Sequence, residues 1–281
     1  MAFEHLIFST ALMIILIIVG KIINQIFMHV NLSELLIHRE NPAVGIELSG
    51  YFLGVSFIIA GTMNIPQALP LNTKIMFALI NGVGGILALA LICRYGIRLI
   101  LSGKCMQAIL DGNVAVGIVS AGFYIAISKI IVGLFSSTVH GNWLYCLIFL
   151  ISSLLAFFII TLIFRQLTSY NDVAEIYDEN IPAALSYAGS MIAVSLIVER
   201  SVGSNFIDYY TSFASFGKAI LFVVGIYPIR QWLVQGLLLG GGFSLYGGSL
   251  DKEISQDKSI GAGIVEAVAY IASAMIAVNL I

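Results

Sequence analysis

Four ionisable residues lie inside long apolar stretches of the sequence, where a charge is costly to bury. Glu47 and Lys21 reach a similar depth on neighbouring stretches, and Glu266 and Arg230 repeat this arrangement in the second half of the chain. A carboxylate with a basic partner is typical either of a structural ion pair or of a relay for protons or cations. The sequence leaves both interpretations open, and it offers Arg94 as a shallower alternative partner for Glu47.

The elements that must position these charges are membrane helices. The chain has 281 residues, of which 59% are hydrophobic and 10% charged, whereas soluble domains carry about 25% charged residues. About 20 apolar residues cross the roughly 30 Å of hydrocarbon in a bilayer. Stretches of this kind cover residues 6–28, 43–63, 75–100, 114–136, 143–165, 182–200, 210–237 and 260–280. The sequence therefore predicts an all-α integral membrane protein with eight transmembrane helices.

Several function classes find no support in the composition. The formal net charge of −2 provides no basic field for nucleic acid. The three cysteines form no Cys-x-x-Cys pair and the four histidines are dispersed, so we expect no metal site and no cofactor. Clusters of His, Asp and Glu typical of an intramembrane active site are missing too. We therefore expect that the protein is not an enzyme.

Three segments of the chain have nearly the same sequence. They read ENPAVGIELSGYFLG from residue 40, GNVAVGIVSAGFYIA from 112 and ENIPAALSYAGSMIA from 179. A weaker fourth copy, SIGAGIVEAVAYIA, begins at residue 259, and the copies start about 70 residues apart. Each copy follows an ordinary apolar stretch and a short polar elbow. The sequence therefore predicts four helix-pair repeats, each with one helix rich in small residues.

The polar residue at the start of each copy is expected to be the N-cap of the following helix. These residues are Asn41, Asn113, Asn180 and Ser259. Direct contact with a permeating solute is the alternative role for the asparagines. Small residues at fixed offsets then share one helical face, where they allow two helix backbones to approach closely. They include Gly45, Gly50, Gly54, Gly117, Gly122, Gly189 and Gly263. We expect the four small-residue helices to pack together inside the molecule, with the other four outside.

The Asn-x-Ala-x-Gly-Ile…Gly pattern at 41–50 and 113–122 resembles the YjfL-like bacterial inner-membrane proteins, domain-of-unknown-function family 350. The resemblance implies four-span units that are each built from two helix pairs. The chain would then hold two units, at residues 1–140 and 141–281. The second unit departs from the pattern, because Ala184 replaces a glycine and Val268 replaces the ninth-position glycine. The resemblance implies a location and an architecture, and it names no substrate.

The distribution of basic residues predicts the topology. Nine of the 13 lysines and arginines lie in the elbows or at the helix ends that face them. Because cytoplasmic loops carry such an excess, the elbows are expected in the cytoplasm and both termini in the periplasm. The repeats and buried carboxylates favour a channel or transporter for a small ion or solute. A membrane scaffold or envelope-stress component, which recruits protein partners through its elbows, is the alternative. Membrane lipids and a homo-oligomer are further expected interactions.

Overall fold

The computed structural model describes residues 2–28, 32, 34–63, 70–135, 143–202, 208–238, 240 and 246–280, and every regular element in this part of the chain is helical. The long helices are α1 (Ala2–Met28), α2 (Pro42–Met63), α3 (Leu71–Leu101), α5 (Val114–Gly133), α7 (Trp143–Gln166), α9 (Ile181–Val202), α10 (Tyr209–Gln231) and α12 (Ile260–Val278). Shorter helices are η1 (Glu34–His38), α4 (Cys105–Leu110), α8 (Asp172–Tyr177), η2 (Trp232–Leu238) and α11 (Ser249–Ser255).

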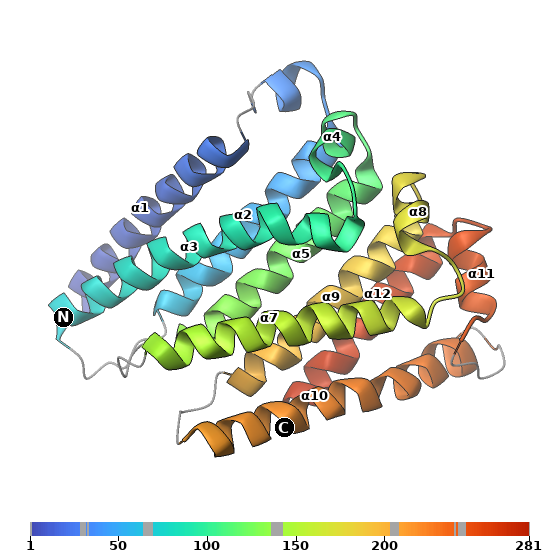
Figure 1. Cartoon of the computed structure of the whole chain (residues 1–281). Coiled ribbons are helices and arrows are strands. Elements are labelled where there is room, and N and C mark those ends of the chain that lie inside the picture. Colours follow the sequence, from blue (N-terminus) through green and yellow to red (C-terminus); the bar gives the residue numbers. More distant parts are fainter. Residues whose placement is uncertain are drawn as a thin grey trace.

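Seven helices of the described part are long and apolar enough to cross a membrane: α1, α2, α3, α5, α7, α9 and α12. They lie where the sequence predicts spans. The eighth expected span, 210–237, is occupied by α10 and η2, but α10 is not among the seven; it has Pro228 inside it. The short elbow helices α4, α8 and α11 gather at one end of the molecule, and both termini lie at the other (Figure 1).

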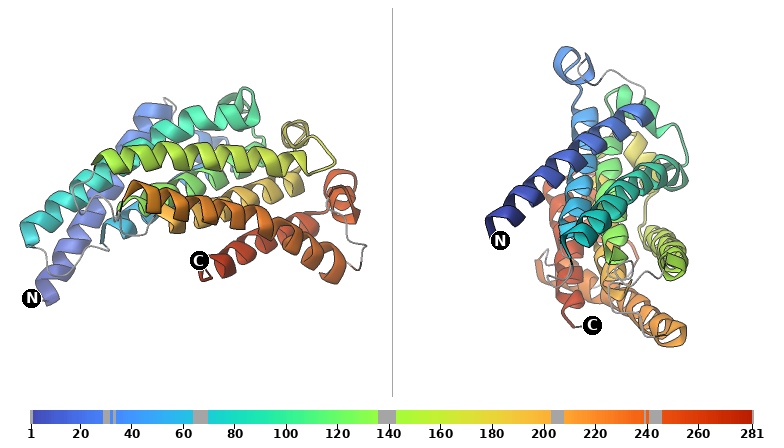
Figure 2. Two further views of the ribbon diagram at one scale, coloured as in Figure 1. Left: turned by 60° about the horizontal axis from the view of Figure 1, so that its bottom comes forward. Right: turned by 90° about the vertical axis from the view of Figure 1, so that its left-hand side faces the viewer.

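The helices α2, α5, α9 and α12 pack side by side in that order, and we call them the glycine row (Figure 2, right). The same close contact recurs at each of its three interfaces. A Cβ added to Gly50, Gly122 or Gly189 would lie 2.5, 2.6 or 2.7 Å from the Cβ of an alanine on the next helix. Those alanines are Ala121, Ala188 and Ala267. Each glycine is nine residues after its cap and each alanine is eight residues after the next cap, so the three helix crossings share one geometry.

A second contact acts in the opposite direction across the row. A Cβ on Gly117 would lie 2.7 Å from the carbonyl oxygen of Ala43, and one on Gly263 would lie 2.7 Å from that of Pro182. Gly45 holds the equivalent position on α2, the first helix of the row. There an added Cβ would meet only Leu36 Cδ2, at an ordinary 3.7 Å. Gly45 is thus the one predicted packing glycine without a close helix contact among the described residues.

The remaining long helices form a second layer. Helix α3 packs against α2 and α5, α7 against α5 and α9, and α10 against α9 and α12, while α1 packs against α2 and α3 (Figure 2). On the opposite face of the row, a groove between α2 and α5 is lined only by residues of these two helices, including Ser49, Leu53 and Ile125. The four small-residue helices pack together as expected, but they form one layer of two and the other four long helices do not surround them (Figure 2), because close Gly–Ala contacts pair each helix of the row with its neighbours.

Candidate functional site

Each helix of the glycine row begins with the predicted cap. The side-chain oxygens of Asn41, Asn113, Asn180 and Ser259 accept hydrogen bonds from the backbone N–H three residues later, at 3.2, 2.9, 3.1 and 3.4 Å. The residue before each cap has a positive φ: 47° at Glu40, 99° at Gly112, 58° at Glu179 and 47° at Lys258. This left-handed residue turns the chain sharply from the elbow helix into the row.

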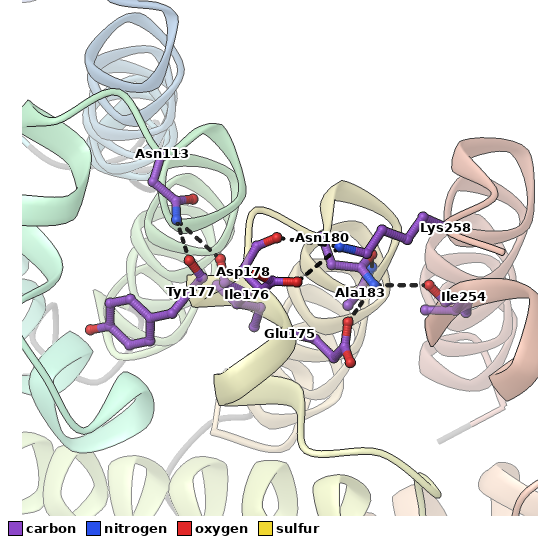
Figure 3. A network of polar contacts seen from close by, with 9 residues as sticks. All are labelled: Asn113, Glu175, Ile176, Tyr177, Asp178, Asn180, Ala183, Ile254 and Lys258. Carbon is purple, nitrogen blue, oxygen red and sulfur yellow. Dashed lines mark hydrogen bonds and ion pairs between the residues drawn. The ribbon is translucent and has the colours of Figure 1, made fainter. Parts of the chain in front are cut away.

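The asparagine amides have a second role that the sequence alone did not indicate. Asn113 Nδ2 donates to the carbonyl oxygens of Ile176 and Tyr177, at 3.2 and 3.1 Å, in the elbow helix of the following copy (Figure 3). Asn180 Nδ2 donates in the same way to Ile254 O, at 3.0 Å, and also to Glu175 Oε2, at 2.7 Å (Figure 3). Each of these side chains therefore fastens its own helix start to the next elbow.

The first copy follows the same rule and the last departs from it. Asn41 Nδ2 donates to Ile109 O and Leu110 O, at 3.0 and 3.1 Å, at the end of α4. Ser259 can cap α12, but it has no amide with which to reach another elbow. The three asparagines thus form a ladder that links all four helices of the row at the elbow end.

A cavity of about 110 Å³ lies beside the row, between α1, α2, α3, α4 and α5. Its lining includes the polar side chains of Asn24, Glu47, Tyr51, Arg94, Ser120 and Tyr124. This volume can hold a few water molecules or a small ion, and the polar groups offer it several partners. The seam of the row itself is closed by the Gly–Ala contacts, so the polar space lies next to the seam.

Glu47 is the central group of this cavity. Its side chain is only 4% exposed, and Ser120 Oγ donates a hydrogen bond to its Oε1 at 3.2 Å. Its Oε2 is buried and has no hydrogen-bond partner in the described part of the chain. Burial of an unpartnered carboxylate oxygen is costly unless a proton or a cation satisfies it. The geometry therefore leaves one acceptor of Glu47 available for such a ligand.

The basic group near Glu47 differs from the one that the sequence predicts. Lys21 is exposed on α1 and does not line the cavity, so the predicted pairing of Lys21 with Glu47 is wrong. Asn24 is the polar residue of α1 that lines the cavity. Arg94, the alternative partner, lines the cavity and its Nη1 donates to Phe27 O. The reason lies in the helix rotation: the side chains of residues 21 and 24 point about 60° apart around the axis of α1, and packing on α3 and α2 turns Asn24 inward and leaves Lys21 exposed.

The second half contains a similar buried carboxylate. Glu266 on α12 is 3% exposed, and Ser186 on the neighbouring α9 is 6% exposed. The predicted partner of Glu266, Arg230, lies in α10, and its side chain is outside the described residues. Towards the termini, Lys129 Nζ forms an ion pair with Glu199 Oε2 at 2.9 Å that joins α5 to α9. The described part of the chain contains no group of three or more His, Cys, Asp or Glu side chains that could hold a metal ion.

Asp172 is a buried carboxylate in the second elbow, with 4% of its surface exposed. Arg165 Nε lies 3.8 Å from its Oδ2, and Thr168 Oγ1 lies 3.1 Å from the same oxygen. Burial raises the pKa of Asp172 from 3.8 to about 7, although the Arg165 charge and the Thr168 hydrogen bond lower it. The elbow is thus a place where protonation and folding are coupled.

Comparison with known proteins gives a family. The family described as Domain of Unknown Function (DUF350) matches the chain twice in tandem, over residues 2–135 and 138–281. The chain belongs to the DUF350 family. It is also similar to a UPF0719 transmembrane protein of Aquifex aeolicus (strain VF5), with 22% identity over 245 residues, which cover 85% of each chain. No solved structure gives a significant match. These findings establish a multi-pass membrane protein that holds two tandem DUF350 units.

Ser120 and Tyr124 are cavity residues that reasoning from the sequence missed. One signal could have identified Ser120. It lies seven residues after Asn113, and Glu266 lies seven residues after Ser259, so the two occupy equivalent places in their repeats. The same comparison marks Tyr124, because Tyr124 and Tyr270 each lie eleven residues after their caps, Asn113 and Ser259. No comparable signal marks Tyr51.

Proposed function

We propose that this DUF350 protein moves a proton or a small cation across the bacterial inner membrane, and that the ion binds at Glu47. One observation carries the proposal: Glu47 Oε2 is buried, has no hydrogen-bond partner among the described residues and belongs to a side chain that lines a polar cavity, while Oε1 accepts a hydrogen bond from Ser120. A binding step of this kind needs a site that is satisfied only when the ion is present. The proposal assigns the protein no enzymatic activity.

The proposed topology has eight spans, with α10 as the eighth, and four helix-pair repeats in two units. The elbows face the cytoplasm and both termini face the periplasm. The excess of basic residues at the elbow end supports this orientation. The Gly–Ala contact that recurs at three interfaces supports the repeats. A reporter that is active only in the cytoplasm should be silent when fused after Ile281, and activity there would reverse the orientation.

The test of the function is ion flux in proteoliposomes that contain the purified protein, measured under proton, Na⁺ and K⁺ gradients. We expect Glu47→Gln to keep the fold and to abolish the flux. Glu199→Gln is the matched control, because Glu199 is a membrane carboxylate that is paired with Lys129 outside the cavity. Lys21→Met should leave flux unchanged, because Lys21 is exposed. Equal flux in the wild type and Glu47→Gln under every gradient would overturn the proposal.

A membrane scaffold is the second candidate, and the asparagine ladder favours it. The ladder holds the elbow helices of successive copies in fixed positions, as a partner-binding surface would need. Ile37, on the first elbow, is 67% exposed and could contact a cytoplasmic protein. If the protein is a scaffold, Ile37→Asp should abolish its cellular role and Glu47→Gln should not. The opposite result supports ion movement.

A further inference from the structure

We infer that the Glu47 cavity binds a small monovalent anion, such as chloride, between Arg94 and Arg98 when Glu47 carries a proton. The inference rests on the proposed function, from which it takes the proton as the ion that binds Glu47. It adds a second ligand to the same cavity, and it gives the two arginines that line this cavity a direct role in binding that ligand.

The charges of the cavity carry the first step. The lining contains one carboxyl group, that of Glu47, and two guanidinium groups, those of Arg94 and Arg98. Arginine is effectively always protonated in proteins, so both positive charges are permanent. The other titratable side chains of the lining are neutral near pH 7: they are Tyr51 of α2, Cys93 of α3, Cys105 of α4 and Tyr124 of α5, while the polar residue from α1 is the uncharged Asn24. The positive charges therefore outnumber the negative one even when Glu47 is ionised, and a protonated Glu47 leaves both of them unbalanced.

Neither arginine forms an ion pair with a carboxylate in the described part of the chain. Arg94 Nη1 donates to Phe27 O, and Arg94 Cζ lies 5.9 Å from the centroid of the Phe27 ring. Both partners are uncharged, so they fix the position of the guanidinium and leave its charge uncompensated. Arg98 is exposed, and its side chain has no hydrogen bond to another described residue. The remaining N–H groups of the two arginines are therefore available to an anion.

The two arginines lie on the side of the cavity that faces the elbows. Glu47 lies six residues after the cap Asn41, and Arg94 lies seven residues before Leu101, the end of α3, so both reach a depth of about 10 Å at 1.5 Å per residue. Arg98 lies one turn nearer the elbows and is exposed, and the elbow helix α4 contributes Met106 to the lining. An anion that enters from the elbow end therefore meets Arg98 first and then reaches the level of Arg94 and Glu47.

The opposite end of the cavity is closed by two tyrosines. The rings of Tyr51 and Tyr124 meet edge to face, with their centroids 5.4 Å apart, and the Tyr51 hydroxyl donates to Gly20 O at 2.7 Å. Val55 and Leu89 lie further from the elbows on α2 and α3, and both are fully buried apolar side chains. A ligand that enters from the elbow end therefore stops beside Glu47.

Glu47 couples the two ligands. Its Oε1 accepts a hydrogen bond from Ser120, and its buried Oε2 has no hydrogen-bond partner among the described residues. An ionised Glu47 repels an anion in the same cavity. A Glu47 that is protonated at Oε2 is neutral and offers the anion an O–H donor. Each ligand therefore favours the binding of the other, and the coupling free energy is the same in both directions.

The first test is chloride binding to the purified protein in detergent, measured by isothermal titration calorimetry in sodium gluconate, whose anion is much bulkier. We expect the wild type to bind chloride about tenfold or more tightly at about pH 5 than at about pH 9, because the ionised carboxylate repels the anion. Glu47→Gln keeps an N–H donor without a charge, so its chloride affinity should be the same at both pH values. Cys93 and Cys105 are still present in this variant, which therefore also controls for their titration. An absence of saturable chloride binding by the wild type, or equal affinity at the two pH values, would overturn the inference.

The second test asks whether the arginines bind the anion. Arg98→Gln should weaken chloride binding by about tenfold or more, and Arg98→Lys should restore most of it because the charge is kept. The Arg98 side chain has no partner among the described residues, so both variants should fold. Arg200→Gln is the matched control, because Arg200 is an exposed arginine near the end of α9 that does not line the cavity, and it should bind chloride like the wild type. Equal chloride affinity in Arg98→Gln and Arg200→Gln would show that the inference is wrong.

Proton flux in proteoliposomes tells a failure of the inference from a failure of the proposed function. Proton uptake down a pH gradient should be about fivefold or more faster in chloride than in gluconate. Chloride binding that follows the pH and the arginines as expected, without flux of any ion, would overturn the proposed function and support the anion site. Proton flux that Glu47→Gln abolishes, without chloride binding by the wild type, would support the proposed function and overturn the anion site.

Discussion

A single substitution in the asparagine ladder can separate the two hydrogen-bonding roles of one side chain. Asn113 caps α5 through its oxygen and fastens the following elbow through its nitrogen. Asn113→Ser keeps a short oxygen that can cap, since Ser259 already caps α12. The same change removes the amide and leaves the carbonyls of Ile176 and Tyr177 without this donor. Asn113→Ser therefore tests the link between copies alone.

The expected magnitude follows from the two lost bonds. A buried acceptor that loses its partner costs about 1–3 kcal/mol. Ile176 is fully buried, so water cannot replace the amide there, but Ile176 O stays paired because it also accepts a hydrogen bond from Glu179 N at 3.2 Å. The bond to Tyr177 is only partly buried. A hydrogen bond whose acceptor does not become buried and unpaired contributes about 0.5–1.5 kcal/mol, so we expect Asn113→Ser to lower the free energy of unfolding by about 1–3 kcal/mol. Asn113→Ala should cost about 1 kcal/mol more, because the cap is lost as well.

The assay is unfolding by SDS in mixed micelles, followed by circular dichroism. Ser259→Ala is the matched control, because it removes a cap that carries no link, and it should cost only about 1 kcal/mol. If Asn113→Ser is as stable as the wild type, or if Asn113→Ala costs no more than Ser259→Ala, the amide does not hold the next elbow and the reasoning is refuted.

Two further predictions use the same assay. Gly50→Ala should destabilise the protein by about 1–3 kcal/mol or more, because its Cβ would lie 2.5 Å from Ala121 Cβ. Gly45→Ala is the control and should be neutral, because its Cβ would lie an ordinary 3.7 Å from Leu36 Cδ2. Equal losses of stability in the two variants would contradict the close packing of α2 on α5. Burial, opposed by Arg165, raises the pKa of Asp172 from 3.8 to about 7, so the folded state favours the protonated acid. Stability should therefore fall by up to about 4 kcal/mol as the pH rises from about 4 to about 7. Asp172→Asn should flatten this part of the profile, and an unchanged profile would refute the assignment.

Local signals in the sequence predicted the helix starts well. The row helices begin directly after Asn41, Asn113, Asn180 and Ser259, because a cap acts within three residues of the helix that it starts. The small-residue offsets likewise predicted which positions make close contacts, since glycine allows an approach that no larger residue permits. These features depend on residue type and spacing, which are readable without a structure.

The rotation of the outer helices could not be predicted in this way. In a soluble helix the polar face marks solvent, but in lipid both faces are apolar and periodicity no longer identifies the buried side. The sequence therefore led to Lys21 as the partner of Glu47, and only packing shows that Asn24 lines the cavity. The two-layer arrangement could not be predicted either, because glycines that form close contacts do not reveal whether a third helix covers the interface between two helices of the row.

The departures of the first and fourth copies have one physical explanation, which is that the row ends there. Val268 takes the place of the contact glycine on α12 and is 57% exposed, because no further helix packs against it. Ser49 holds the position of the contact alanine on α2 and is likewise exposed. Ser259 has no side-chain amide, and no described elbow helix follows α12. A valine at the contact position would separate the backbones of two copies that joined edge to edge. We therefore expect that two chains do not join through this contact and that a homo-oligomer uses a different surface.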